Sequence, residues 1–221
     1  MHATTTRTST FSISLGSGAR ELLKWIALLA MTGDHVAKVV FGGYVPVVTE
    51  LGRIAFPLFA LVMACNLAQP GADLRKSMRR LALWGVIAQP LHALVFGSWL
   101  PLNILLTFAL AAVAVHALAN NRPLLLLLAA GVLPMLVDYQ WAGVGSVLLA
   151  WIAFRHRAWW TLLIALAAVC WANRNGWAVL AVPVVLLAAR VQWQLPRWRW
   201  MFYGYYVGHL LVLAVVARVL S

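Results

Sequence analysis

Long apolar stretches fill most of the chain, and short polar or basic stretches separate them. Runs this continuous predict α-helices, because the strands of an outer-membrane barrel alternate apolar and polar residues instead. We therefore expect an all-α, polytopic integral membrane bundle of about nine transmembrane helices, over residues 21–41, 52–69, 81–97, 102–119, 124–137, 141–154, 159–173, 177–190 and 201–220. The sixth to eighth stretches are short for a bilayer core of about 30 Å, so a count of eight stays open.

Residues 1–20 differ from the rest of the chain because they are rich in Ser and Thr. They lack the apolar core of a cleavable signal peptide. We expect them to form a flexible cytoplasmic tail, followed by a single transmembrane domain over residues 21–221.

Composition supports a membrane location. The chain is 64% hydrophobic and only 10% charged, whereas a soluble domain is roughly half apolar and about a quarter charged. This excludes a soluble enzyme, a disordered regulator and a small disulfide-stapled module. Cys65 and Cys170 both lie inside apolar runs, where a cysteine usually acts as a small hydrophobic residue.

The charge is strongly basic, with 17 Lys and Arg residues against 5 Asp and Glu. Because the basic residues lie between apolar runs, they indicate topology signals and contacts with anionic membrane lipids, and we expect no nucleic acid as partner. With a cytoplasmic N-terminus, only Lys38, Arg53, Arg174 and Arg218 fall at outer ends. The positive-inside rule therefore predicts a multi-pass protein of the bacterial inner membrane, with its N-terminus inside and, for nine spans, its C-terminus outside.

The first apolar stretch carries the most ionisable residues, which are expensive in a membrane and are therefore functional candidates. Lys24 and His35 are eleven residues apart, which places them on one helix face about 16 Å apart along the axis. Lys24 alone is equally explained by a lysine that reaches lipid phosphate. Asp34 and Lys38 have ion-pair spacing, whereas Asp34 and His35 point about 100° apart and cannot share one task by helix geometry alone.

Further polar residues fall at the same outer level. Together they predict a polar cavity that opens away from the cytoplasm, and they are Glu50, Arg53, His92, Asn103, Thr107, Asp138, Tyr139, Asn173, Arg174 and Asn175, with His209 near mid-depth. Motifs for nucleotide hydrolysis, flavin chemistry or metalloproteolysis are absent from the sequence. The scattered His and Cys residues predict no metal site.

Five sequence stretches carry a family resemblance: LKWIALLAMTGDH (23–35), GRIAFPLF (52–59), LNILLT (102–107), DYQWAGVG (138–145) and YYVGH (205–209). The chain resembles the TraX family of membrane proteins, whose named member acetylates the N-terminus of conjugative pilin. These chains tend to carry a Pro between the last Tyr and His, where this chain has Val207-Gly208. The spacing of Lys24 and His35 is also similar to the signature of the acyltransferase 3 family.

The resemblance implies an acyl-CoA-dependent acyltransferase that moves an acetyl group from cytoplasmic acetyl-CoA to the N-terminal amine of an exported, pilin-like protein. It implies His35 as the base. We then expect Lys24, Arg79 and Arg80 to bind the phosphates of acetyl-CoA. The further catalytic candidates are Asp34, or Asp138 with Tyr139, to orient His35 or the ammonium, Arg53 and Asn103 to stabilise the oxyanion, and His209.

Two other functions stay open. An O-acetyltransferase that acts on a cell-envelope glycan would use the same cofactor with a hydroxyl acceptor. A small-solute transporter would need no acyl donor, but the paired Gly/Pro-broken repeats common in transporters are not evident in the sequence.

Overall fold

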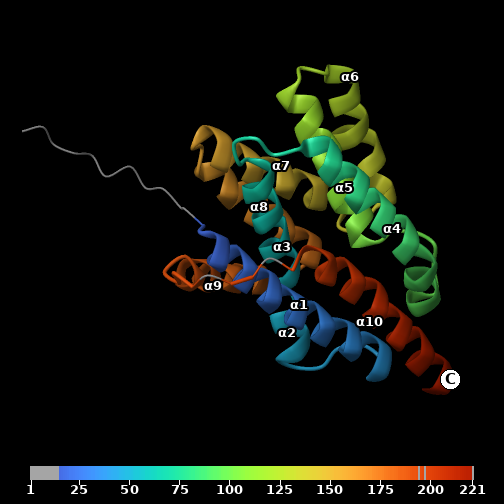
Figure 1. Cartoon of the computed structure of the whole chain (residues 1–221). Helices are drawn as coiled ribbons and strands as arrows, with labels where there is room; N and C mark the ends of the chain where they lie inside the picture. The colour runs from blue at the N-terminus through green and yellow to red at the C-terminus, as the bar shows by residue number, and fades with distance from the viewer. Residues whose placement is uncertain (1–14, 194, 197, 221) are drawn as a thin grey trace, which may run out of the picture.

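The computed structural model describes residues 15–193, 195–196 and 198–220. The expected N-terminal tail therefore lies largely outside the described residues. Within them the chain is helical, and β-structure is limited to one isolated bridge between Leu102 and Val137. The all-α prediction is confirmed (Figure 1).

Each of the nine predicted apolar segments coincides with one helical run in the described residues. These runs are α1 (Ser17–Val40), α2 (Val48–Gly52) with α3 (Ala55–Leu67), α4 (Leu74–Phe96), α5 (Ile104–Ala119), α6 (Pro123–Leu126) with η1 (Leu127–Val132) and η2 (Leu133–Leu136), α7 (Gln140–His156), α8 (Trp160–Asn173), η3 (Trp177–Leu180) with α9 (Ala181–Ala188), and α10 (Arg199–Leu220). Three helices begin four or more residues before their apolar segments: α1 at Ser17, α2 at Val48 and α4 at Leu74.

The ends of α4 and α5 follow from local chemistry. The Asp73 carboxylate accepts a hydrogen bond from the Lys76 amide and caps the start of α4, as short acidic side chains commonly do. At its other end Gly97 adopts a left-handed conformation with φ of 72°, which glycine accommodates without strain. The Asn103 side chain then caps α5 by accepting from the Leu105 amide.

Residues 123–136 form one irregular run in place of a regular α-helix. A single α-turn passes into a π-helix over Leu127–Val132 and a 3₁₀-turn over Leu133–Leu136. Pro134 has no amide proton and cannot continue the α-helical pattern. The carbonyl of Gly131 is instead satisfied by Trp141 Nε1 at 2.9 Å.

The helix α3 lies at the centre of the bundle. It packs against α1, α7 and α9, while α4 packs against α5 and α10, and α10 also contacts α1 (Figure 1). One apolar core joins α3, α4, α5 and α7. A second core joins α1, α3 and α9. Because α3 contributes to both, the two halves of the bundle share one hydrophobic interior.

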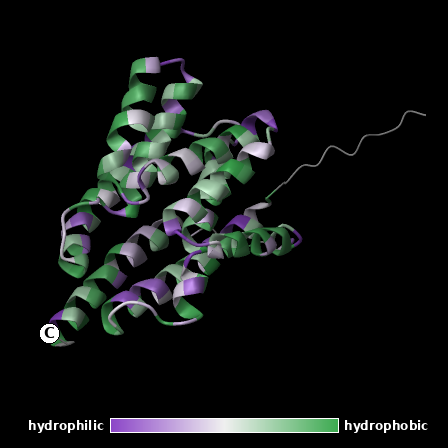
Figure 2. Ribbon diagram, turned by 180° about the vertical axis from the view of Figure 1, so that it is seen from behind, coloured by the Kyte–Doolittle hydropathy of each residue, from purple (hydrophilic) through white to green (hydrophobic). Residues whose placement is uncertain are grey.

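Two stretches are long and apolar enough to cross a membrane by length and composition, Val48–Leu67 and Trp200–Val219. Hydrophobic residues cover most of the ribbon, and hydrophilic ones gather mainly at turns and helix ends (Figure 2). Many large apolar side chains face outward, including Leu163, which is 71% exposed, and Trp171, which is 85% exposed. Such extensive apolar surface marks a membrane or protein contact.

Candidate active site

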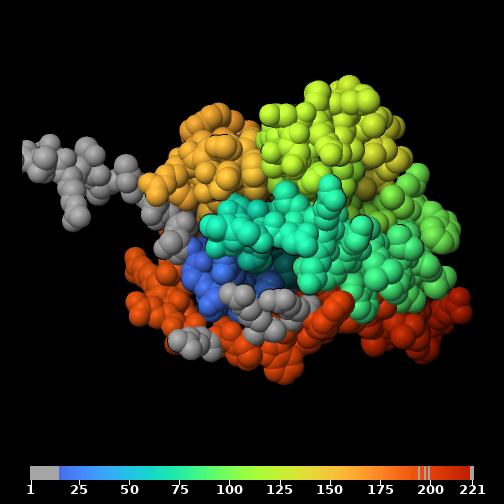
Figure 3. Space-filling model, turned by 45° about the horizontal axis from the view of Figure 1, so that its top comes forward, coloured from blue at the N-terminus to red at the C-terminus, as the bar shows by residue number. Residues whose placement is uncertain are grey.

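A cavity of about 1230 Å³ runs along α1, from Ser17 near its start to Lys38 near its end. Its walls come from α1, α3, α4 and α10, with the segments 101–108, 137–142 and 171–174 at the far end. The space-filling view shows the surface hollowed between α1 and the segment that joins α3 to α4 (Figure 3). The cavity therefore connects two groups of polar residues that lie at opposite ends of α1.

The end of the cavity near the start of α1 is basic. It is lined by Arg20 and Lys24 of α1 and by Lys76 and Arg80 of α4. Lys24 Nζ lies 2.7 Å from the carboxylate of Glu21 and 4.4 Å from the centre of the Phe202 ring. Glu21 is buried, so its charge holds the ammonium of Lys24 against the cavity wall.

This basic set differs from the one expected from the sequence. Arg80 lines the cavity, but the side chain of Arg79 is exposed and does not line it. Arg79 is one residue out of phase, because Lys76 and Arg80 share a helix face at i and i+4. The same spacing relates Arg20 to Lys24, so helix periodicity would have identified both residues that the sequence analysis missed.

His35 lies on the cavity wall and contacts a second histidine. His35 Nδ1 is 2.9 Å from His209 Nε2, and the two rings stack with centroids 5.1 Å apart. His209 is buried and does not itself line the cavity. Two residues 174 positions apart in the sequence are thus brought together by the packing of α10 on α1.

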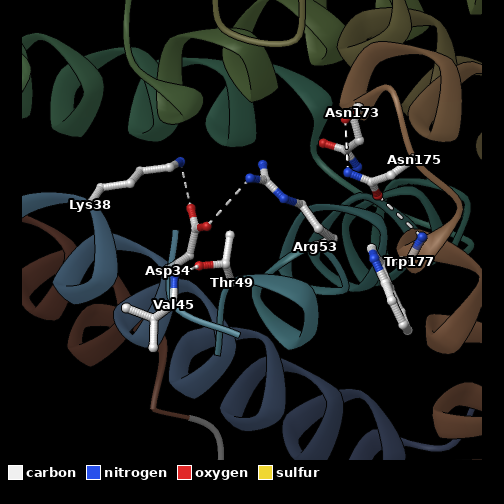
Figure 4. Close-up of polar contacts among 8 residues, drawn as sticks. All are labelled: Asp34, Lys38, Val45, Thr49, Arg53, Asn173, Asn175 and Trp177. Atoms are coloured by element: carbon white, nitrogen blue, oxygen red, sulfur yellow. Dashed lines mark hydrogen bonds and ion pairs between the residues drawn. The ribbon is translucent and has the colours of Figure 1, made fainter. Parts of the chain in front are cut away.

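Asp34 has partners other than His35. Lys38 Nζ lies 2.6 Å from one carboxylate oxygen and Arg53 Nη2 lies 3.8 Å from the other, and the two cations approach from opposite sides (Figure 4). The close approach of α2 needs Gly52, since a Cβ there would lie 2.6 Å from Asp34 Cβ. The structure thus places Asp34 in an ion cluster at the far end of the cavity, not in a position to orient His35.

Asp138 and Tyr139 also line this far end. One carboxylate oxygen of Asp138 accepts from the Tyr139 amide at 2.9 Å, and its carbonyl accepts from Thr107 Oγ1 at 2.9 Å. Desolvation raises the pKa of Asp138, which the bond from the Tyr139 amide opposes. The Tyr139 ring stacks on Phe56. Neither side chain hydrogen-bonds His35 in the described part of the chain, so an orienting role there has no geometric support.

Asn103 does not reach the cavity, which corrects its expected oxyanion role. Its side chain is fully buried, and its Nδ2 donates to the Gly85 carbonyl at 2.7 Å and to Gln89 Oε1 at 2.8 Å. Its Oδ1 accepts from the Leu105 amide. An amide nitrogen has two protons, and both are occupied, so Asn103 fixes the start of α5 against α4 instead.

His92, Asn173 and Arg174 complete the far end. His92 Nδ1 and Asn173 Nδ2 are buried without a hydrogen-bond partner among the described residues. Glu50, by contrast, bonds Tyr44 outside the cavity. The described residues contain no group of three His, Cys, Asp or Glu side chains placed to hold a metal. The site is therefore a polar chamber with unused donors, and His35 lines it between its basic end and its mixed-charge end.

Comparisons with known proteins point to one family. Two Escherichia coli proteins, each named Protein TraX, are 39% identical over 95 residues and, in strain K12, 35% identical over 109 residues. These matches cover 43% and 48% of this chain and 38% and 44% of the relatives, so they span less than half of the curated proteins. An uncharacterized Rickettsia prowazekii protein is 28% identical over 102 residues, 46% of this chain and 38% of its own.

No solved structure matches this chain. The family model of the TraX protein, however, matches residues 19–217, which include both members of the histidine pair, His35 and His209. The chain therefore belongs to the TraX family.

Proposed function

We propose that this chain is a multi-pass acetyltransferase of the bacterial inner membrane, which moves an acetyl group from cytoplasmic acetyl-CoA to the N-terminal amine of an exported, pilin-like protein. Family membership and the two candidate spans indicate a membrane protein. The observation that carries the proposal is the continuity of the cavity from the basic cluster, past His35, to the far polar end.

The basic end suits the nucleotide part of acetyl-CoA. Phosphates are polyanions that cannot enter hydrocarbon, and charge-assisted hydrogen bonds from Lys and Arg bind them strongly. Arg20, Lys24, Lys76 and Arg80 supply four cations around one opening. The positive-inside rule places this end in the cytoplasm, with the C-terminus of a nine-span chain outside. The narrow pantetheine arm then extends along α1 and brings the thioester to His35.

His35 is placed to accept the proton that the acceptor loses. An α-amine has a pKa of about 8, so a substantial fraction is already a free nucleophile near neutral pH. The amine nitrogen attacks the thioester carbonyl, a C–N bond forms, the C–S bond breaks, and CoA leaves as the thiol after protonation. A positioned imidazole base assists such a step. Arg53 lines the same chamber and is the candidate donor to the developing oxyanion.

The far end offers a partner for the incoming ammonium. Asp34 is already paired with Lys38 and Arg53. One oxygen of Asp138 accepts from the Tyr139 amide, whereas the other has no hydrogen bond among the described residues. We assign Asp138 to dock the acceptor amine before it loses its proton. This favours an amine over a sugar hydroxyl, which has no positive charge to pair with a carboxylate.

A direct assay tests the proposal. The purified protein is incubated with acetyl-CoA and a peptide that carries a free N-terminus, and CoA release and peptide mass are measured. We expect CoA release and a peptide heavier by one acetyl group, and no product from a peptide whose N-terminus is blocked. Acetylation of a glycan in place of the peptide would support the O-acetyltransferase, and the absence of any CoA release would favour a transporter.

Removal of one cavity cation tests the CoA end. Lys24→Ala should raise the KM for acetyl-CoA about tenfold and change kcat less, because a phosphate contact stabilises the ground state and the transition state alike. Arg79→Ala is the matched control: it removes the same charge from the same end, yet Arg79 does not line the cavity. Its KM should stay within about twofold. Equal KM values for the two variants would contradict the assignment.

A further inference from the structure

His209 lies next to His35 and is itself out of reach of a substrate. His35 lines the cavity, whereas His209 is 9% exposed and does not line it. The Tyr205 ring stacks on His209, and its hydroxyl lies 2.9 Å from Thr32 Oγ1 of α1. The second histidine is therefore held between α10 and α1, where it contacts the first but not the cavity.

The hydrogen bonds of His209 define where its proton resides. His209 Nδ1 lies 3.1 Å from the backbone carbonyl of Tyr205. A carbonyl oxygen only accepts, so Nδ1 carries the proton. In a neutral imidazole the other nitrogen is then an acceptor. His209 Nε2 therefore presents a lone pair to its neighbour.

The same reasoning extends to His35. His35 Nδ1 lies 2.9 Å from His209 Nε2, and since that nitrogen accepts, His35 Nδ1 must donate. Neutral His35 then carries its only proton on Nδ1 and leaves Nε2 unprotonated. Among the hydrogen bonds of the described residues, His35 takes part through Nδ1, and none involves its Nε2. Nε2 is therefore the ring nitrogen of His35 whose lone pair stays available.

We propose that His209 is a positioning residue, which holds His35 as the Nδ1–H tautomer so that His35 Nε2 is the atom that takes the proton from the acceptor amine. The inference rests on the proposed acetyl transfer and adds the atom and the residue that orients it. No proton passes to His209: the amine proton moves to His35 Nε2, and the resulting imidazolium keeps its Nδ1–H bond to His209. The hydrogen bond from His209 Nδ1 to the Tyr205 carbonyl increases the electron density on His209 Nε2, and this strengthens the bond that His209 Nε2 accepts from His35 Nδ1.

Three variants test the positioning role of His209. His209→Ala removes the acceptor. His209→Gln places an amide oxygen on the same helix position, which accepts from His35 Nδ1–H. Trp25→Leu is the matched control, because it removes a ring contact with Phe202 across the same interface of α1 and α10, and Trp25 neither lines the cavity nor contacts either imidazole among the described residues. Each purified variant is assayed for kcat and KM, and ¹⁵N NMR of labelled His35 reports which ring nitrogen carries the proton.

We expect wild-type His35 to be protonated on Nδ1. In His209→Ala, both tautomers should be populated, with kcat lower by about 10–100-fold, within the range of a positioned base, and an unchanged KM for acetyl-CoA. His209→Gln should recover most of the kcat, and Trp25→Leu should stay within about twofold of wild type.

The tautomer measurement tests the role of His209 separately from the proposed acetyl transfer, because it needs no turnover. A wild-type His35 that carries its proton on Nε2 overturns the positioning role of His209 even in an active enzyme. A kcat of His209→Ala equal to that of wild type does so as well. If His35 carries its proton on Nδ1 but the protein never releases CoA, the proposed acetyl transfer is overturned, and with it the catalytic role of the His35–His209 contact.

Discussion

His35→Ala should abolish most acetyl transfer while the bundle still folds and binds acetyl-CoA. We expect kcat to fall by about 10²–10⁴-fold, the usual contribution of a positioned base. The KM for acetyl-CoA should change little, because the basic cluster at the other end of the cavity is untouched. Steady-state kinetics on the purified variant, with thermal stability measured in parallel, provides the test.

The matched control is His116→Ala. It makes the same chemical change at the far end of α5, where His116 contacts Asn120 and does not line the cavity. Its kcat should stay within about twofold of wild type, since a base contributes only where it reaches the substrate. Near-normal turnover by His35→Ala would remove the base from the mechanism, whatever the behaviour of His116→Ala.

Asn103→Ala should give the largest loss of stability and little loss of intrinsic activity. The change removes the helix cap on the Leu105 amide, worth about 1 kcal/mol. It also takes one donor from the Gly85 carbonyl and one from Gln89 Oε1, which keeps its bond from the Asn103 backbone amide. The loss of a buried hydrogen bond costs about 1–3 kcal/mol, so we expect a total loss of about 2–4 kcal/mol. A thermal melt in detergent, with kcat corrected for the folded fraction, measures both effects.

Asn120→Ala makes the same substitution at the other end of α5. Asn120 is exposed, and among the described residues its side chain bonds His116 of its own helix, so its loss should cost less than about 1 kcal/mol. Conversely, a well-folded Asn103→Ala protein with a kcat lowered 100-fold would restore Asn103 as an oxyanion donor and contradict its assignment to the helix cap.

Local periodicity predicted a substantial part of the fold and of the site. The nine apolar stretches anticipated the nine helical runs in the described residues, because hydrophobic length alone defines such segments. The same helical geometry placed Lys24 and His35 on one face, and both line the cavity. The same periodicity would also have predicted Arg20 and Lys76, which lie four residues before Lys24 and Arg80 on the cavity face, and would have placed the exposed Arg79 off that face.

Long-range packing decided what the sequence could not. The contact of His209 with His35 depends on how α10 crosses α1, and no local pattern encodes that crossing. Asn103 illustrates the same limit, because an Asn before a helix predicts a cap and a catalytic donor equally well until its neighbours in α4 are known. The irregular run over residues 123–136 depends on where Pro134 interrupts the hydrogen-bond pattern.

Transfer across a sealed membrane tests the central claim most directly. The protein is reconstituted into vesicles that enclose a peptide with a free N-terminus, and acetyl-CoA is added only outside. If the cavity along α1 connects the two sides, mass spectrometry will find acetylated peptide inside and free CoA outside, with vesicles of His35→Ala giving none. Product that forms only when peptide and acetyl-CoA share one compartment would contradict transfer through the bundle.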